Sequence, residues 1–114
     1  MQNEWGDVRL ATDAFDLSGK NALVIGAGHA PGRAIALALG EAGANVAVSS
    51  ITTDGEEVMR CRSAQKEIAK LGRTSMAVAT DVTLGTGVQV MVRQVAKELG
   101  GIDILVNAPD LFLG

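Results

Sequence analysis

The sequence of 114 residues has one cysteine, one histidine, two prolines and no tyrosine, and aromatic residues make up only 3% of it. Because Cys61 is alone, it cannot form a disulfide within the chain. No cysteine and histidine cluster of the kind that binds zinc is present either. A chain without disulfides is typical of a reducing compartment, so we expect a cytoplasmic protein.

Long apolar runs and excess charge are also lacking. The net charge is −3 and the acidic residues are scattered, so no basic patch indicates a nucleic-acid or anionic-lipid partner. No apolar run approaches the roughly 18 residues that a membrane-spanning helix needs. The segment from Met1 to Asp16 lacks the apolar core of a signal peptide. We therefore expect neither a nucleic-acid partner nor membrane attachment.

Apolar residues, at 47%, and glycine, with 14 residues, are abundant in the sequence. Short apolar runs alternate with stretches of helical periodicity, and glycines follow each stretch. This alternation predicts strands at 21–25, 45–48, 75–80 and 102–106, and helices at 31–42, 54–71 and 88–99. Strands that alternate with helices favour a parallel sheet with right-handed crossovers and helices on both faces. We therefore expect one doubly wound α/β domain over residues 16–114, after a polar lead-in at 1–15.

The apolar stripes predict which helix faces are buried. In the first helix the stripe consists of Ile35, Leu39 and Ala42, with Ala38 beside them. In the second helix Asp54 and Glu57 have the spacing of a capping box. Its stripe is Val58, Cys61, Ala64 or Gln65, Ile68 and Leu71, and that of the third helix is Val88, Met91, Val92, Val95 and Leu99.

A glycine-rich loop, Gly26-Ala-Gly-His-Ala-Pro-Gly32, lies between the first strand and the first helix. Without side chains, such a loop lets a pyrophosphate approach the N–H groups and the positive dipole at the helix start. A turn that serves only packing is the alternative, but the position between strand and helix favours a dinucleotide site. The candidate residues here are Gly26, Gly28, His29, Pro31 and Gly32. For His29 we favour an exposed loop side chain over a phosphate or ribose contact.

Several segments in order resemble short-chain dehydrogenases/reductases. Residues 16–26, the glycine loop and residues 33–39 resemble the opening of that family, and residues 43–48 resemble its second strand. Asp81 and Val82 match the pair that contacts the adenine ring in that family, and Asn107 with Ala108 begins the counterpart of its Asn-Asn-Ala-Gly motif. The resemblance implies a Rossmann-like sheet, incomplete here, with strand order 3-2-1-4. It further implies NAD or NADP as cofactor, a small-molecule substrate for the full-length protein, and a homo-oligomer.

Two motifs depart from the family pattern. The middle glycine of the loop is replaced by Ala30, followed by Pro31, which either narrows the approach to the pyrophosphate or is tolerated. The second motif continues as Pro109-Asp110, and an inward-facing Asp110 would repel phosphate. These changes bear on affinity and not on the fold.

The choice between NAD and NADP usually depends on an acidic residue at the end of the second strand. Ser50 occupies that position, and Asp54 follows as a helix cap. Arg33 is either near a 2′-phosphate or a solvated helix residue. The sequence leaves the preference open.

The catalytic tyrosine, lysine and serine that the family resemblance implies are not found. The sequence has no tyrosine, and we assign no catalytic residue. We expect the cofactor-binding front part of an oxidoreductase, with the apolar strand at 102–106 covered by the rest of a longer protein or by a partner chain. The alternatives are a non-catalytic nucleotide-binding or structural subunit, and a divergent, enoyl-reductase-like member.

Overall fold

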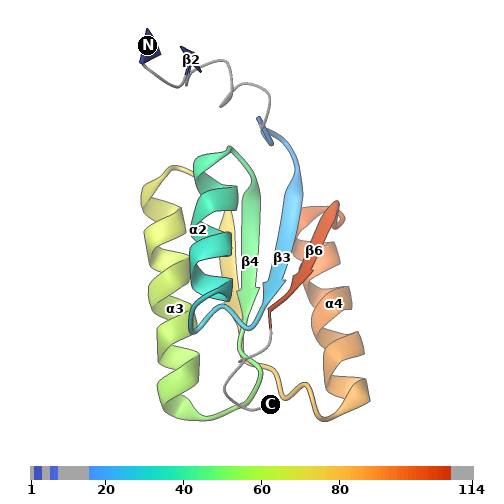
Figure 1. Cartoon of the computed structure of the whole chain (residues 1–114). Helices are drawn as coiled ribbons and strands as arrows, with labels where there is room; N and C mark the ends of the chain where they lie inside the picture. Colours follow the sequence, from blue (N-terminus) through green and yellow to red (C-terminus); the bar gives the residue numbers. More distant parts are fainter. Residues whose placement is uncertain (1, 4–5, 8–15, 109–114) are drawn as a thin grey trace.

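The computed structural model describes residues 2–3, 6–7 and 16–108. A two-residue antiparallel pair, β1 (Gln2–Asn3) and β2 (Gly6–Asp7), precedes the main body. Strands and helices then alternate along the chain (Figure 1). They are β3 (Asn21–Ile25), α2 (Gly32–Glu41), β4 (Asn45–Ser49), α3 (Gly55–Lys70), β5 (Ser75–Val78), α4 (Gly85–Leu99) and β6 (Ile104–Asn107).

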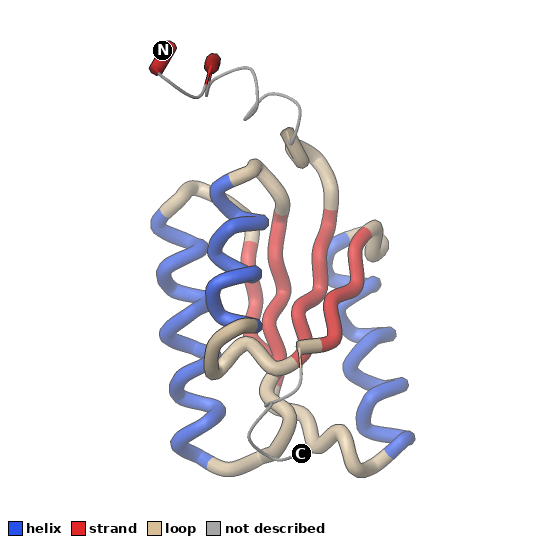
Figure 2. Tube along the Cα trace, in the orientation of Figure 1, coloured by secondary structure: helices blue, strands red, loops and turns tan. Residues whose placement is uncertain are grey.

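The four long strands form one parallel sheet in the order β5-β4-β3-β6. Counted from β3, this is the predicted order 3-2-1-4. Helices α2 and α3 cover one face of the sheet and α4 lies on the other (Figure 2). The predicted doubly wound α/β fold, with four strands and three helices, is therefore confirmed.

The core has two layers because both faces of the sheet are covered. Strands β3 and β4 send alternate side chains to opposite faces, as parallel strands buried on both sides do. The layer under α2 and α3 is built around Ala22, Val24, Val46, Val48, Cys61 and Ile68. The layer under α4 is built around Leu23, Ile25, Ala47, Met91 and Val95.

The buried face of α2 differs from the prediction. Its buried residues are Gly32, Ala36 and Gly40, whereas Ile35 is only partly buried and Ala38 is exposed. The helix lies so close to its neighbours that small residues fill the contact. A Cβ on Gly40 would lie 3.2 Å from the Cγ2 of Ile68. A stripe of apolar residues in the sequence identifies large side chains, whereas close contact between a helix and its neighbours requires small residues.

The position of the start of α3 and most of its buried face were predicted correctly, but only half of the capping box forms, because the N–H of Asp54 donates to the Thr52 hydroxyl and not to Glu57. Asp54 is the N-cap, and its carboxylate accepts a hydrogen bond of 3.2 Å from the N–H of Glu57. Of the two alternatives, Ala64 is buried and Gln65 is partly exposed. Leu71, the expected end of the stripe, is 39% exposed because it follows the helix as its C-cap.

Two strand boundaries differ from the predicted ones, because side chains take the place of main-chain hydrogen-bond partners. β5 ends at Val78, two residues before the predicted end, because the N–H of Thr80 donates to the Ser50 hydroxyl at 3.0 Å. β6 begins at Ile104, two residues later than predicted. Just before it, the Asp103 carboxylate accepts the N–H of Asn21 at 2.8 Å.

Strand β6 is at one edge of the sheet. Within residues 16–108 it pairs with β3 alone, and Leu105 on it is 60% exposed. None of the helices in the described ranges is long and apolar enough to cross a membrane. A partner for this edge remains a prediction.

Candidate functional site

The carboxyl ends of the four parallel strands meet at one edge of the sheet. In register across the sheet, Val78, Ser49, Ile25 and Asn107 form one row there. The chain leaves β3 for helix α2 on one face, while β6 is reached from α4 on the other face. Such a switch of face between neighbouring strands opens a crevice outside their carboxyl ends, where α/β proteins bind ligands. The predicted site residues lie in this row, in the loops that follow it and at the start of α2.

The glycine loop is packed too tightly for side chains at its two ends. Gly26 has φ +89°, and a Cβ there would overlap the carbonyl oxygen of Ala108. A Cβ on Gly32 would overlap the carbonyl of Gly26 and lie 3.2 Å from the Cβ of Ala108. The N–H of Ala108 in turn donates to the carbonyl of Ile25 at 2.9 Å. The structure therefore brings three predicted residues, Gly26, Gly32 and Ala108, into direct contact.

Between Gly26 and Gly32 the loop has two buried residues, of which Ala27 is one, and three exposed residues. Gly28 is buried, and a Cβ there would lie 3.2 Å from the Cγ of Glu57. His29, Ala30 and Pro31 are exposed, as we favoured for His29. Helix α2 begins at Gly32, one residue later than predicted, with Pro31 as its N-cap.

The side chain of Arg33 is held between two helices, and its approach to a 2′-phosphate stays a prediction. Its guanidinium donates to the carbonyl of Arg60 at 3.3 Å and to the Ser63 hydroxyl at 3.4 Å. The side chain thus joins α2 to α3. It is only partly exposed and is held on the helix pair.

Ser50 follows β4, as predicted, but its side chain is turned inward. The residue is fully buried, and its hydroxyl accepts from the N–H of Thr80 and donates to the carbonyl of Thr80 at 3.4 Å. Because the hydroxyl holds β4 to the chain after β5, it is not on the surface where a ribose would bind.

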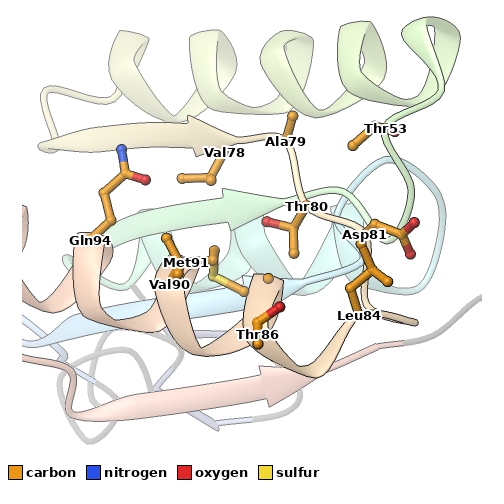
Figure 3. Close-up of a pocket in the computed structure, with 11 residues that line it drawn as sticks. Thr53, Val78, Ala79, Thr80, Asp81, Leu84, Thr86, Val90, Met91 and Gln94 are labelled. Atoms are coloured by element: carbon orange, nitrogen blue, oxygen red, sulfur yellow. The ribbon is translucent and has the colours of Figure 1, made fainter.

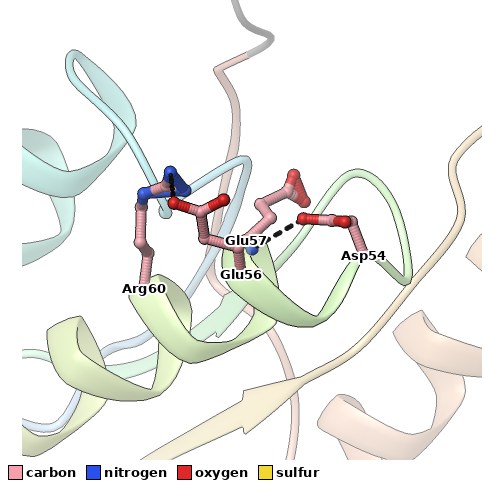
Figure 4. Close-up of polar contacts among 4 residues, drawn as sticks. All are labelled: Asp54, Glu56, Glu57 and Arg60. Atoms are coloured by element: carbon pink, nitrogen blue, oxygen red, sulfur yellow. Dashed lines mark hydrogen bonds and ion pairs between the residues drawn. The ribbon is translucent and has the colours of Figure 1, made fainter.

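Glu57 is the site residue that the sequence did not indicate. It is 8% exposed, and its Oε1 accepts from the N–H of Ile51 at 2.6 Å and of Thr52 at 2.9 Å. Figure 4 shows Glu57 with the N-cap Asp54, beside the exposed pair Glu56 and Arg60. The spacing from Asp54 predicted a capping box, but a sequence pattern does not show that the carboxylate reaches back to the end of β4.

Asp81 and Val82 lie beyond the end of β5, beside the segment after β4. Hydrogen bonds from the Thr83 hydroxyl at 2.6 Å and from its main-chain N–H at 2.9 Å lower the pKa of Asp81. The N–H of Val82 donates to the carbonyl of Ile51 at 2.9 Å. Asp81 is therefore an ionised carboxylate in a tight turn, next to the segment that Glu57 holds.

Asn107 ends β6 opposite Ile25, with its side chain exposed. It therefore lies beside the glycine loop at the face switch. Pro109, Asp110 and the rest of the 109–114 segment lie outside the described residues, so the expectation for Asp110 stays a prediction.

Two hollows open at this edge. The one at the glycine loop measures about 10 Å³ and is lined by Gly26, Gly28, His29, Ala30, Ile51, Glu57 and Ala108. The other measures about 350 Å³ and lies between the end of β5 and α4 (Figure 3). Its lining is largely apolar and includes Val78, Leu84, Val90 and Met91, with Asp81 at one end. The glycine loop thus presents a shallow surface and not a deep cavity.

Cys61 lies behind the loop, in the core layer that also contains Ala27. Burial, and then the negative charge of Glu57, raise the pKa of its thiol from 9.0 to about 11. Over the part of the chain that the structure describes, no group of three histidine, cysteine, aspartate or glutamate residues is placed to hold a metal ion. We therefore assign Cys61 to the core.

Residues 20–109 match the family model for short-chain dehydrogenases. The chain belongs to the short-chain dehydrogenase/reductase family. The short-chain dehydrogenase/reductase astE of Aspergillus oryzae is 42% identical over 94 residues, which are 82% of this chain and 34% of that protein.

Solved structures of the family agree in fold. A short-chain dehydrogenase from Burkholderia cenocepacia J2315 in complex with NADP has a TM-score of 0.77 at 36% identity, over 85% of this chain and 38% of its own. A 7α-hydroxysteroid dehydrogenase complexed with NADH has a TM-score of 0.76 at 33% identity, over 84% of this chain and 36% of its own. The chain thus spans about a third of the length of these family members.

Proposed function

We propose that this chain is the dinucleotide-binding front part of an NAD(P)-dependent short-chain oxidoreductase. The observation that carries the proposal is the glycine loop at the face switch. Gly26 and Gly32 are packed against the end of β6 with no room for a Cβ. Family members of the same fold were solved with NADP and with NADH. We take residues 16–114 as the binding domain.

The loop fits a pyrophosphate in shape. Gly28 presents no side chain, and exposed His29 and Pro31 form the rim at the start of α2. Because the enclosed hollow is only about 10 Å³, the phosphates would lie over the loop and not inside it. The N-terminal end of a helix favours such an anion through its free N–H groups and its dipole.

The other predicted residues would hold the remaining parts of the dinucleotide. Asp81 and Val82, which follow β5, would contact the adenine, and Asn107 and Ala108 lie on the β6 side of the loop. Ser50 has no direct part in this proposal, because its hydroxyl is buried against Thr80.

The bound cofactor would donate or accept a hydride at its nicotinamide ring, while this chain binds and orients it. The sequence contains no tyrosine, so the acid/base of the family is not among these residues. We propose that transfer between nicotinamide and a carbonyl or alcohol substrate requires residues beyond this sequence. The free edge of β6, with exposed Leu105, would then be covered by those residues or by a partner chain, as in a homo-oligomer.

A second candidate function is a non-catalytic nucleotide-binding subunit. The observation that favours it is Ala30-Pro31 at the exposed rim, where the family has glycine. The two functions differ in what accompanies this chain. A longer reading frame that contains the family's tyrosine and lysine would contradict the second candidate.

Titration of the purified chain with NADH and NADPH, followed by nicotinamide fluorescence and by thermal stability, tests the proposal. We expect saturable binding of at least one of them and a higher midpoint of unfolding, since a ligand that binds only the native state stabilises it. A folded chain that binds neither would overturn the proposal.

A further inference from the structure

We propose that Glu57, from helix α3, is the residue that makes this site select NAD over NADP. The inference rests on the proposed function, because it concerns how the same site treats the adenosine ribose. Acidic selection is ordinarily a property of the end of the second strand. Here that position is Ser50, which is buried and uncharged, and the carboxylate comes instead from the first turn of the following helix.

The first argument is the occupation of hydrogen-bond donors. The segment after β4 is where a Rossmann fold contacts the adenosine ribose. Its N–H groups at Ile51 and Thr52 already donate to the Oε1 of Glu57, at 2.6 and 2.9 Å. A 2′-phosphate would need such donors and would find both engaged by a carboxylate.

The second argument is position. Glu57 lines the same small hollow as Gly26, Gly28 and His29, and its Cγ would be 3.2 Å from a Cβ on Gly28. The carboxylate therefore lies between the glycine loop and the end of β4. Its Oε2 makes one long contact, 3.3 Å to the N–H of Ile51, and retains acceptor capacity for a ribose hydroxyl.

The third argument is charge. A phosphate monoester carries about −1.5 to −2 at neutral pH, and repulsion by a carboxylate is strong where water is partly excluded. Of the two arginines nearby, Arg60 is paired with the Glu56 carboxylate at 2.8 Å. Arg33, on α2, keeps its charge, but its guanidinium is held on the helix pair by the carbonyl of Arg60 and the Ser63 hydroxyl. The segment from Ser50 to Asp54 contains no basic residue.

The test compares three forms of the chain: the natural sequence, Glu57→Gln and Glu67→Gln. Glutamine at position 57 keeps an oxygen that can accept from Ile51 and Thr52 while it removes the charge. Glu67→Gln removes the same formal charge from the opposite end of α3, where the side chain is 47% exposed and pairs with Lys70, and is therefore the matched control. Dissociation constants for NADH and NADPH are measured on each form by nicotinamide fluorescence, and folding is checked by circular dichroism.

We expect the natural chain to bind NADH at least about tenfold more tightly than NADPH, a difference that short-range charge repulsion readily supplies. Glu57→Gln should reduce that ratio by at least about fivefold, mainly by tightening the binding of NADPH, whereas Glu67→Gln should leave it within about twofold. Equal affinities in the natural chain, or a preference for NADPH, would overturn the inference. An unchanged ratio in a folded Glu57→Gln chain would overturn it as well.

A measurement that needs no variant covers the case in which Glu57→Gln does not fold. Adenosine 5′-monophosphate and adenosine 2′,5′-bisphosphate are compared as competitors of NADH on the natural chain. We expect the bisphosphate to compete more weakly, and stronger competition by it would contradict the role of Glu57. Absence of any dinucleotide binding by the folded natural chain would instead overturn the proposed function, and this inference with it.

Discussion

Helices α2 and α3 both begin with a glycine at the carboxyl edge of the sheet, but for different physical reasons. Gly32 opens α2 where a Cβ would overlap the carbonyl of Gly26. Gly55 opens α3 with no atom within 4 Å of its would-be Cβ, and the nearby chain is held by the side chains of Asp54 and Glu57. The first loop depends on the absence of side chains and the second on their hydrogen bonds. Close packing therefore requires glycine at the first helix position in the first loop, but not in the second.

The largest effect is expected from Gly32→Ala, which adds a side chain to the loop that depends on having none. The new methyl group would overlap the carbonyl of Gly26, which cannot move without displacing the end of β3, so we expect a loss of at least ~3 kcal/mol in the free energy of unfolding. Urea denaturation followed by circular dichroism measures it. A loss below ~1 kcal/mol would show that the loop relaxes and that its packing is less strict than the geometry indicates.

Cys61 lies in the core behind the glycine loop and the segment after β4. The reactivity of its thiol therefore shows how readily this part of the structure opens. With its pKa at about 11 in the native chain and 9.0 ordinarily, its thiolate fraction at pH 8 should be about a hundredfold lower in the native state than in the unfolded state. We expect iodoacetamide to react correspondingly more slowly without urea than with it. Equal rates would mean that the layer under the loop opens readily.

The same pKa shift has a consequence for stability. Between pH 9.0 and about 11 the unfolded chain loses the thiol proton while the native chain keeps it. The unfolded state therefore binds fewer protons, and the stability of the native chain should fall as the pH rises through this window. Below pH 9 both states keep the proton, and this group makes stability neither rise nor fall.

Ser50→Ala tests the hydrogen-bonded loop. It removes the acceptor for the buried N–H of Thr80, and an unsatisfied buried donor costs ~1–3 kcal/mol. Thermal unfolding of the variant measures the loss. Thr53→Ala, at an exposed position of the same segment, is the control and should change stability by less than ~0.5 kcal/mol. Similar effects of the two substitutions would contradict the role given to Ser50.

The smallest effect is expected from Gly55→Ala, the counterpart of Gly32→Ala. The new methyl group meets nothing, and alanine restricts the unfolded chain, so stability should rise by ~0.4–1 kcal/mol. Urea denaturation of the two alanine variants side by side gives the comparison its sharpest form. Destabilisation by Gly55→Ala would show that α3 also needs glycine at its first position.

The sequence predicted the order of the elements and the sheet, because strands and helices here have distinct apolar periods. It predicted less well where backbones come close. The apolar stripe of α2 pointed to Ile35 and Leu39, whereas the fully buried residues are Gly32, Ala36 and Gly40. Leu39 packs against the same core layer but is only partly buried. Small residues carry a weak hydrophobic signal, although they permit the closest packing.

The candidate site, too, was predicted only in part. The glycine loop and Ala108 were predicted from motif and position, and the structure places them in contact. The direction of individual side chains was not predictable. The Ser50 hydroxyl faces inward, the Arg33 side chain joins two helices, and the Glu57 carboxylate binds main-chain N–H groups after β4 and not the N–H of Asp54. Such choices depend on partners far along the chain, which spacing within one segment does not encode.

The row formed by Val78, Ser49, Ile25 and Asn107 has a consequence for insertions and deletions. Removing one residue from a strand before this row would shift its loop by ~3.3 Å and exchange its inward and outward faces. Adding residues after the row would lengthen a loop and leave the strand pairing unchanged. The row therefore marks the point beyond which strand register no longer constrains the length of the chain, and changes in the loops after it can alter binding preferences without altering the sheet.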